Sequence, residues 1–197
     1  MRLLLVGLLL GVAQAKITPD TEAVCSTLHS KFPDKLVWDP VGTNGVDTWN
    51  LASIYNTALF DYWNAASSLI RPACTFFPSN AEEASYAVKT LIAYPEVKYA
   101  VKSGGHSPNL GFASTDKGVL IAFRPNSKYA IPSPDGKTID VGAGCKWEDV
   151  YGALQPLGKA VVGGRLGDVG VTGLILGGGL SYLSAQYVSL RVQLFHE

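Results

Sequence analysis

The sequence has 197 residues, and its 16 basic and 16 acidic side chains give a formal net charge of zero. Hydrophobic residues make up 47% of the chain, which is enough for one substantial core or two small ones. The balanced charge provides no basic surface, so it argues against binding to nucleic acid or to an anionic membrane.

Residues 1–15, MRLLLVGLLLGVAQA, predict a secretory signal peptide. Arg2 precedes an apolar stretch at 3–12, and the small residues Ala13 and Ala15 provide a cleavage site. The apolar stretch is too short to span a bilayer as a helix. An apolar first helix of the fold is the alternative, but no polar face interrupts the stretch. We therefore expect a secreted protein that is cut after Ala15.

Residues 16–69 predict a leader arm of irregular structure. VWDPVGTNGVDTWN is rich in turn-forming residues, and NTALFDYWNAASSLIRP is rich in aromatic residues and alanine. We expect one or two helical turns that pack across the domain behind them.

A regular pattern begins at ACTFF, residues 73–77, which predicts a short apolar strand. A helix should follow, because Ser79 and Glu82 fit a capping box and Pro95 would end it. The apolar residues at helical spacing, which should form its buried face, are Ala84, Ala87, Val88, Leu91 and Ile92. KYAVK, residues 98–102, predicts a second strand.

A strand, a helix and a strand with short connections form a βαβ unit, whose two strands are parallel. The segment SGGHS, residues 103–107, comes directly after the second strand. It should therefore lie at the carboxyl end of a parallel sheet, where open α/β sheets usually bind ligands.

The segments after residue 107 also predict strands and a helix. GVLIAF at 118–123 predicts a buried strand, and the turn at 134–137 should join two extended stretches. WEDVYGALQPLG predicts a helix with Gly158 near its end, and KAVVGG at 159–164 predicts a strand.

Residues 163–179 form a second glycine-rich segment, in which eight of the seventeen residues are glycine. This density is too high for a stable helix or strand, since each interior glycine costs about 0.5–1 kcal/mol relative to alanine. Close approach to a ligand or to another backbone would compensate. The glycines also interrupt the apolar region 171–183, so no membrane span is predicted there.

Familiar nucleotide-binding motifs are absent from the sequence. Trp147 and Tyr182 stand where the last glycine of a G-x-G-x-x-G motif would be, and there is no G-x-x-x-x-G-K-[ST]. Two glycine-rich loops remain, each after a predicted strand. Successive backbone N–H groups in such loops can bind a pyrophosphate, and Ser103 and Ser107 could add hydroxyl donors.

The loop at 103–107 taken alone could equally be a tight turn with a solvent-facing histidine. The presence of two such loops favours a phosphate-bearing cofactor. His106 is the only side chain in the loops with chemistry near neutral pH, and a neutral imidazole could attack an electrophilic carbon of that cofactor.

The three cysteines, Cys25, Cys74 and Cys145, allow three disulfide pairings. Cys145 has small and apolar neighbours, which suits a buried, unreactive thiol. The sequence has no C-x-x-C pair and no His/Cys cluster at ligand spacing, so we expect no metal site.

KSGGHS, followed by WEDVYGAL and by VVGGRLGDVGVTGLILGGGLSYLS, resembles the FAD-binding domain of secreted FAD-linked oxidoreductases. The resemblance is to the berberine bridge enzyme and vanillyl-alcohol oxidase type, with a PCMH-type FAD-binding domain, and is strongest to its fungal branch. It covers residues 50–187 and implies an α+β fold with two subdomains. The domain itself would be residues 70–187.

The resemblance also implies roles for matching residues. His106 matches the histidine that bonds covalently to the methyl carbon on the dimethylbenzene edge of the flavin. The cofactor-binding positions implied in the two loops are Lys102, Ser103, Gly104, Gly105, Ser107, Asp168, Val169, Gly170 and Gly173. No catalytic base is implied at any position of this chain.

Cys25 and Cys74 match a leader disulfide of related enzymes. Some relatives attach the flavin a second time, through a cysteine at the position that Leu166 occupies here. The resemblance therefore implies FAD that is attached once, through His106.

Members of this family continue beyond the flavin domain into a substrate domain. Here SYLSAQY runs into VSLRVQLFHE, so residues 188–197 form an atypical tail. The tail resembles the product of a truncated or mis-spliced gene, and implies a fold that is incomplete at its C-terminus and lacks the substrate domain.

The function implied is oxidation of a small organic substrate by hydride transfer to flavin, with oxygen as acceptor. Two alternatives belong to other classes. One is a non-catalytic truncated product or small secreted binding protein on a partial flavin fold, whose open sheet edge would aggregate. The other is a carbohydrate-binding module, which fits the aromatic residues but leaves both glycine loops unexplained.

Overall fold

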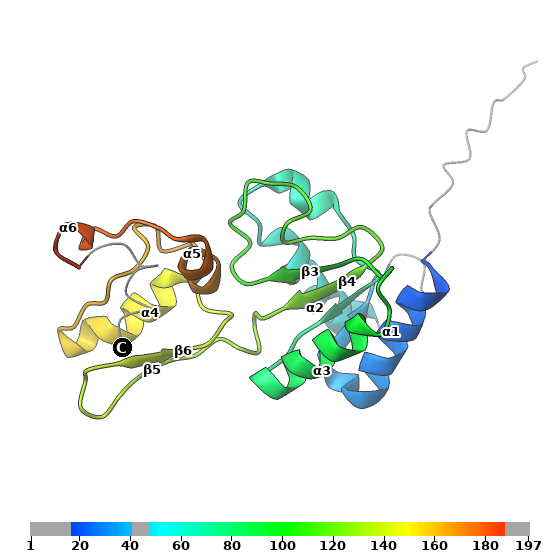
Figure 1. Ribbon diagram of the computed structural model, residues 1–197, viewed down its shortest axis with the longest axis horizontal. Helices are drawn as coiled ribbons and strands as arrows, with labels where there is room; N and C mark the ends of the chain where they lie inside the picture. The colour runs from blue at the N-terminus through cyan, green and yellow to red at the C-terminus, as the bar shows by residue number, and fades with distance from the viewer. Residues whose placement is uncertain (1–16, 41–47, 188–197) are drawn as a thin grey trace, which may run out of the picture.

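The computed structural model describes residues 17–40 and 48–187, which form two lobes side by side (Figure 1). The sheet lobe comprises residues 17–40 and 48–122, and the hairpin lobe comprises residues 130–187. The predicted signal peptide and the atypical tail lie outside the described residues. None of the described helices combines the length and the apolar character that a membrane crossing requires.

The sheet lobe contains a four-stranded sheet in the order β1-β2-β4-β3. Its strands are β1 (Leu36–Trp38), β2 (Cys74–Phe76), β3 (Tyr99–Lys102) and β4 (Val119–Ala122). β4 pairs in parallel with both β2 and β3, whereas β1 is antiparallel to β2. The predicted parallel arrangement of β2 and β3 is confirmed, with β4 between them. Every residue of β4 is buried, as its uninterrupted apolar sequence predicts for a central strand.

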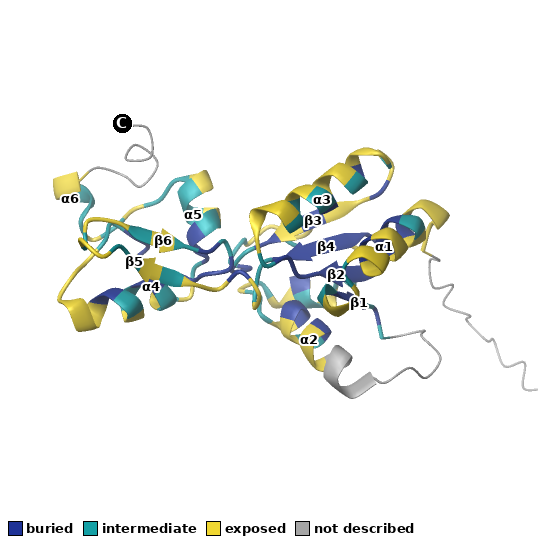
Figure 2. Ribbon diagram, turned by 90° about the horizontal axis from the view of Figure 1, so that it is seen from below, coloured by how far each residue is buried: buried dark blue, intermediate teal, exposed yellow. Residues whose placement is uncertain are grey.

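Three helices cover the two faces of this sheet (Figure 2). α1 (Pro19–Lys31) and α3 (Ala81–Ile92) pack on the face that carries Phe76 and Ile121. α2 (Thr48–Phe60) packs on the opposite face, where Leu59 meets Leu120 in a second core. The alternation of side chains along each strand thus supplies two separate apolar layers.

The prediction of an irregular leader arm is wrong. α1 and α2 have 13 residues each, and β1 adds a strand to the sheet. Thr18 caps α1 by accepting a hydrogen bond from the N–H of Thr21, and Pro19 occupies the first turn, where proline is tolerated. Neither helix separates polar and apolar residues strongly along its length, so periodicity alone does not reveal them.

The helix after β2 is present, but its predicted start is displaced by one residue. Asn80, rather than Ser79, is the N-cap, and its side chain accepts from the N–H of Glu83. Glu83, rather than Glu82, accepts the N–H of Ser79. Ala87 and Leu91 are buried as predicted, whereas Val88 and Ile92 are 44% and 72% exposed. The buried stripe is therefore narrower than the pattern indicates.

A disulfide joins Cys25 in α1 to Cys74 in β2 and confirms the pairing implied by the resemblance. Cys145 is free and buried, as expected. Short 3₁₀ helices at Pro33–Lys35 and Ala65–Leu69 complete the sheet lobe.

The hairpin lobe starts with β5 (Ala130–Pro132) and β6 (Ile139–Val141), which pair antiparallel around the predicted turn. α4 (Trp147–Leu154), a 3₁₀ turn (Gln155–Leu157), α5 (Val171–Gly177) and α6 (Ser184–Tyr187) follow. Gly158 ends the 3₁₀ turn with φ of +61°, a left-handed conformation that glycine adopts without strain. A third core surrounds Trp147 and Val150.

Two predictions for this lobe are wrong. Residues 159–164 form no strand, because β5 and β6 pair with each other and Val161 and Val162 pack against the α4 core instead. The glycine-rich segment does contain a helix, α5, despite Gly173 and Gly177 within it. Packing of Val171 into the third core supplies stability that glycine content does not reveal.

Candidate functional site

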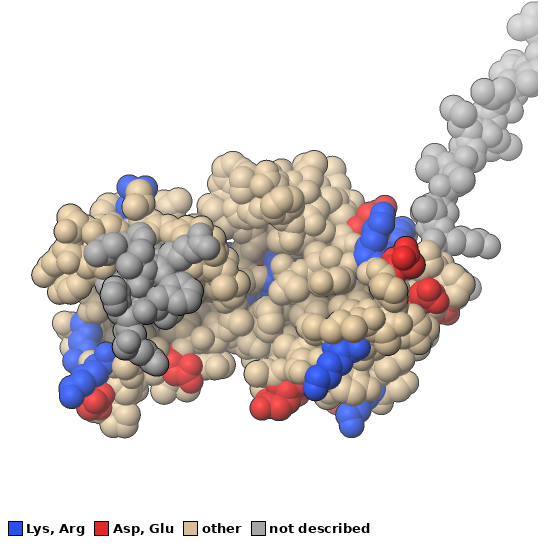
Figure 3. Space-filling model, viewed as in Figure 1, with Lys and Arg blue, Asp and Glu red and all other residues tan. Residues whose placement is uncertain are grey.

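The two glycine-rich loops line one cavity of about 580 Å³ between the lobes. The first loop, residues 103–107, leaves the carboxyl end of β3, and the second loop, residues 163–179, runs through the hairpin lobe. Figure 3 shows the surface hollowed between the lobes, with mostly uncharged residues around the hollow. The predicted site residues that line the cavity are Ser103, Gly104, Gly105, His106, Ser107, Val169, Gly170 and Gly173.

The two loops touch through their backbones at Gly104 and Gly170. A Cβ atom on Gly104 would lie 2.5 Å from both Cα and N of Gly170, closer than real Cβ contacts. Gly105 has φ of +73°, which also favours glycine. Close backbone approach therefore explains why these positions are glycine.

Hydroxyl groups connect the first loop to the hairpin lobe. Ser103 Oγ donates to the carbonyl of Ala143 at 2.7 Å, and Thr172 Oγ1 donates to the same carbonyl at 3.1 Å. Ser107 Oγ accepts from the N–H of Asn109 at 3.3 Å, which leaves its own hydroxyl proton for another acceptor. The predicted role as a hydroxyl donor to a cofactor therefore suits Ser107, whereas the hydroxyl of Ser103 holds the first loop against the hairpin lobe.

The rest of the cavity wall is largely apolar. Its members include Val101, Phe123, Leu166, Leu174 and Leu176. A wall of this kind beside glycine-rich backbone suits a ligand that combines a phosphate with a flat ring system.

His106 lies in this cavity with 23% of its side chain exposed. Its ring centroid is 5.8 Å from that of Trp63, and its Nδ1 is 3.9 Å from Oδ2 of Asp168. Among the described residues that line the cavity, it is the only imidazole. An aromatic ring and a carboxylate therefore lie close to the imidazole of His106, which the sequence indicates as the reactive group of the first loop.

Asp168 is not among the cavity-lining residues. Its Oδ1 accepts a hydrogen bond from Lys146 Nζ at 2.5 Å, and the same Nζ donates to Asp61 Oδ1 at 2.8 Å. Burial lowers the pKa of Lys146, but the hydrogen bonds to Asp168 and Asp61 outweigh this effect and raise the pKa overall. Lys146 was not predicted, since its partners are 85 and 22 residues away in the sequence.

Lys102 is also outside the cavity, although it adjoins the first loop. Its buried side chain points towards α2, where Nζ donates to the carbonyl of Ala58 and lies 3.8 Å from the centroid of the Tyr62 ring. Burial lowers the pKa of Lys102 to about 8.

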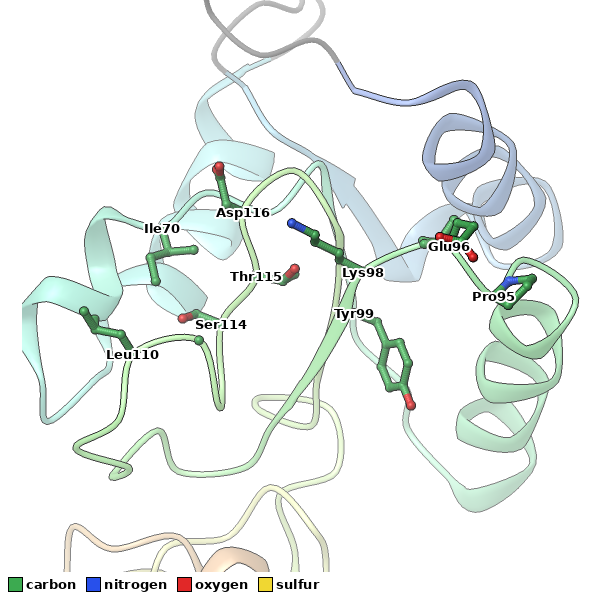
Figure 4. Close-up of a pocket in the computed structure, with 11 residues that line it drawn as sticks. Ile70, Pro95, Glu96, Lys98, Tyr99, Leu110, Ser114, Thr115 and Asp116 are labelled. Atoms are coloured by element: carbon green, nitrogen blue, oxygen red, sulfur yellow. The ribbon is translucent and has the colours of Figure 1, made fainter.

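A second cavity, of about 610 Å³, lies between the start of β3 and the segment 110–116 (Figure 4). Lys98, Tyr99 and Asp116 line it, and it includes no residue of either glycine loop. Within residues 17–40 and 48–187, no group of three or more His, Cys, Asp or Glu side chains could hold a metal ion.

Residues 72–195 match the protein family described as FAD binding domain. An uncharacterized FAD-linked oxidoreductase of Arthroderma benhamiae is 47% identical over 133 residues, which cover 68% of this chain and 26% of the relative. A FAD-dependent monooxygenase of Aspergillus niger is 36% identical over 168 residues, which cover 85% of this chain and 28% of the relative.

Solved structures show the same fold. A berberine bridge enzyme variant in complex with (S)-reticuline superposes with a TM-score of 0.68 at 21% identity, covering 89% of this chain and 34% of that chain. For 6-hydroxy-D-nicotine oxidase from Arthrobacter nicotinovorans the TM-score is 0.63 at 23% identity, with coverage of 79% and 31%. The predicted α+β fold is confirmed. This chain spans about a quarter of the length of the curated relatives and about a third of the solved structures.

Proposed function

The chain belongs to the FAD-binding domain family of flavin-dependent oxidoreductases and monooxygenases, and on this premise we propose that its interlobe cavity holds FAD with His106 as a covalent tether. The single observation that carries the proposal is that both glycine loops and His106 line one cavity.

The residues present fit this cofactor. Gly104, Gly105 and Gly170 line the cavity without side chains, so backbone amide groups border it, which suits the pyrophosphate. The apolar wall, with Phe123 and Leu174, suits the flat ring system. His106, close to Trp63 and Asp168, offers a nucleophilic nitrogen from the same cavity.

Bound FAD would supply the capacity to accept a hydride from a small organic substrate and to pass electrons to molecular oxygen. The chain's own residues bind the cofactor, exclude water along the apolar wall and keep the tether in place. We place the chain in a secreted enzyme, where a covalent bond would prevent loss of the cofactor into a dilute medium. Attachment would also make the flavin a stronger oxidant.

The tether can be tested by expressing the chain, denaturing it in acid and measuring the yellow absorbance that stays with the polypeptide. We expect the wild type to retain the colour and His106→Ala to lose all of it, because no other imidazole lines the cavity among residues 17–40 and 48–187. His29→Ala is the matched control, since His29 is exposed on α1. Colour that acid releases from the wild type would contradict the tether, and a chain that binds no FAD would contradict the whole proposal.

A further inference from the structure

Lys146 connects the two lobes through its amino group. It precedes α4 in the hairpin lobe and is 6% exposed. Its Nζ donates to Asp61 Oδ1 of the sheet lobe at 2.8 Å and to Asp168 Oδ1 of the second glycine loop at 2.5 Å. One buried ammonium group therefore holds two carboxylates from different lobes.

Asp168 lies next to His106, and Asp61 is close in sequence to Trp63, a second neighbour of His106. Asp168 presents its second oxygen, Oδ2, 3.9 Å from the Nδ1 atom of His106. Asp61 is two residues before Trp63, whose N–H donates to the carbonyl of Gly105 at 3.1 Å and whose ring faces the imidazole. Lys146 thus contacts one neighbour of His106, the carboxylate of Asp168, and the segment that carries the other, the indole ring of Trp63.

The exposure of the three side chains shows which of them organises the others. The Lys146 side chain is 8% exposed, whereas those of Asp61 and Asp168 are 38% and 63% exposed. Without the lysine, both carboxylates could turn towards water and would not be left as buried unpaired charges. Removing the amino group should therefore release Asp168 and Asp61 without unfolding the chain.

Other contacts hold the connecting segment 123–129 against the hairpin lobe. Arg124 Nη1 donates to Asp149 Oδ2 at 2.7 Å and to the carbonyl of Gly144 at 3.0 Å, and Lys128 pairs with Asp149 at 2.9 Å. None of these pairs contacts His106. Asp149 also accepts a hydrogen bond from the backbone N–H of Lys146 at 2.9 Å, so these contacts fix the start of α4, whereas the amino group of Lys146 remains free to hold Asp61 and Asp168.

We propose that Lys146 is a positioning residue for His106, which it serves by holding Asp168 and the Asp61–Trp63 segment close to the imidazole. The expected consequence of this positioning is correct attachment of the cofactor, and that consequence rests on the proposed function. The positioning itself concerns the chain alone and can be measured without the cofactor.

The test compares Lys146→Met with Lys35→Met, the same substitution in an ion pair of the sheet lobe whose carboxylate, Glu83, contacts neither Lys146 nor the two glycine loops. The imidazole ¹⁵N signals of His106, assigned by their loss in His106→Ala, report on its surroundings. Hydrogen exchange of the amides at 103–107 and 166–170 reports on the loops. We expect Lys146→Met to shift or broaden the His106 signals and to speed loop exchange about tenfold. Lys35→Met should match the wild type.

Covalent flavin provides the second measurement. Lys146→Met should retain far less acid-stable colour than the wild type, and Lys146→Arg should recover part of it because it restores the positive charge. Unchanged His106 signals and loop exchange in Lys146→Met would overturn the inference, whatever the flavin content. A wild type without flavin would remove the proposed function, while the signals and exchange rates would still decide the role of Lys146.

Should Lys146→Met fail to fold, Asp168→Asn takes its place, because Asp168 is 63% exposed and the buried ammonium group of Lys146 keeps Asp61 as its partner. The same change in the His106 signals is expected. Signals identical to those of the wild type would overturn the inference.

Discussion

At the residue scale, contact between Gly104 and Gly170 explains how two loops that are far apart in the sequence enclose one cavity. Neither position has space for a side chain, since the Cβ atom of each would lie within 3 Å of the other's backbone. The loops are therefore close because both lack side chains there.

Substitution of Gly104 by alanine should separate the loops. The added methyl group, 2.5 Å from Gly170, has no flexible side chain to displace, so we expect a loss of about 1–3 kcal/mol in the free energy of unfolding. FAD retention should fall as well. Chemical denaturation and acid-stable colour measure the two effects.

Gly152→Ala provides the control for this substitution. No atom lies within 4 Å of a Cβ atom there, and the residue is exposed within α4. Alanine should stabilise this helix by about 0.5–1 kcal/mol and leave FAD retention intact. Equal behaviour of the two alanine variants would contradict the role given to the Gly104 contact.

Local sequence predicts part of this site and misses the rest for a physical reason. The first loop and His106 reach the cavity because the preceding strand places them at the carboxyl end of the sheet. Lys102 turns away because alternate residues of a strand face opposite sides. The sequence does not reveal Lys146, because its partners Asp61 and Asp168 come close to it only in the folded chain.

At the element scale, α1 and α2 are part of the fold and not an arm laid across it. α1 buries Val24 and Leu28 against β2 and α3, and α2 covers the other face. Their stability comes from tertiary packing, and a periodicity argument detects only helices with a clear apolar stripe. α3 was predictable because it has such a stripe. The strands β2, β3 and β4 were predictable because each is a short apolar segment.

The disulfide between α1 and β2 should contribute much of the stability of the sheet lobe. It links residues 49 positions apart, and the loop-entropy relation gives about 4 kcal/mol for a loop of this length. Replacement of Cys25 and Cys74 by alanine should lower the free energy of unfolding by roughly that amount in urea denaturation.

Cys145→Ala is the matched control, because Cys145 is equally buried but unpaired. It should cost much less than the double replacement, and a reductant should still destabilise it. If reductant leaves the wild type unchanged while the double variant is weakened, lost packing at Cys25 and Cys74 is the cause, and the crosslink is not.

At the scale of the whole molecule, titration of Lys102 should make the free energy of unfolding depend on pH. Burial lowers the pKa of Lys102 to about 8, and burial raises the pKa values of Tyr55 and Tyr62. Between about pH 8 and 10 the unfolded chain binds more protons at Lys102 than the folded chain does, so stability rises with pH. Above about pH 10 the tyrosines reverse the trend, because the folded chain keeps their protons longer.

The contribution of Lys102 can be isolated by comparing the wild type with Lys102→Met in urea denaturation from pH 7 to pH 10.5. The wild type should gain about 3 kcal/mol relative to the variant across this range. Lys89→Met, at an exposed position of α3, should show no such difference. A wild-type curve parallel to that of Lys102→Met would show that Lys102 titrates normally.

The two lobes also differ in the order in which a ribosome makes them. The last strand of the sheet lobe ends at Ala122, whereas the cavity wall extends to Gly178. N-terminal parts of a chain generally fold first during synthesis. The loop that carries His106 therefore stands beside a finished sheet while the hairpin lobe is still emerging. Under the proposed function, capture of FAD between the lobes would therefore be a late event, which requires translation of the second glycine loop.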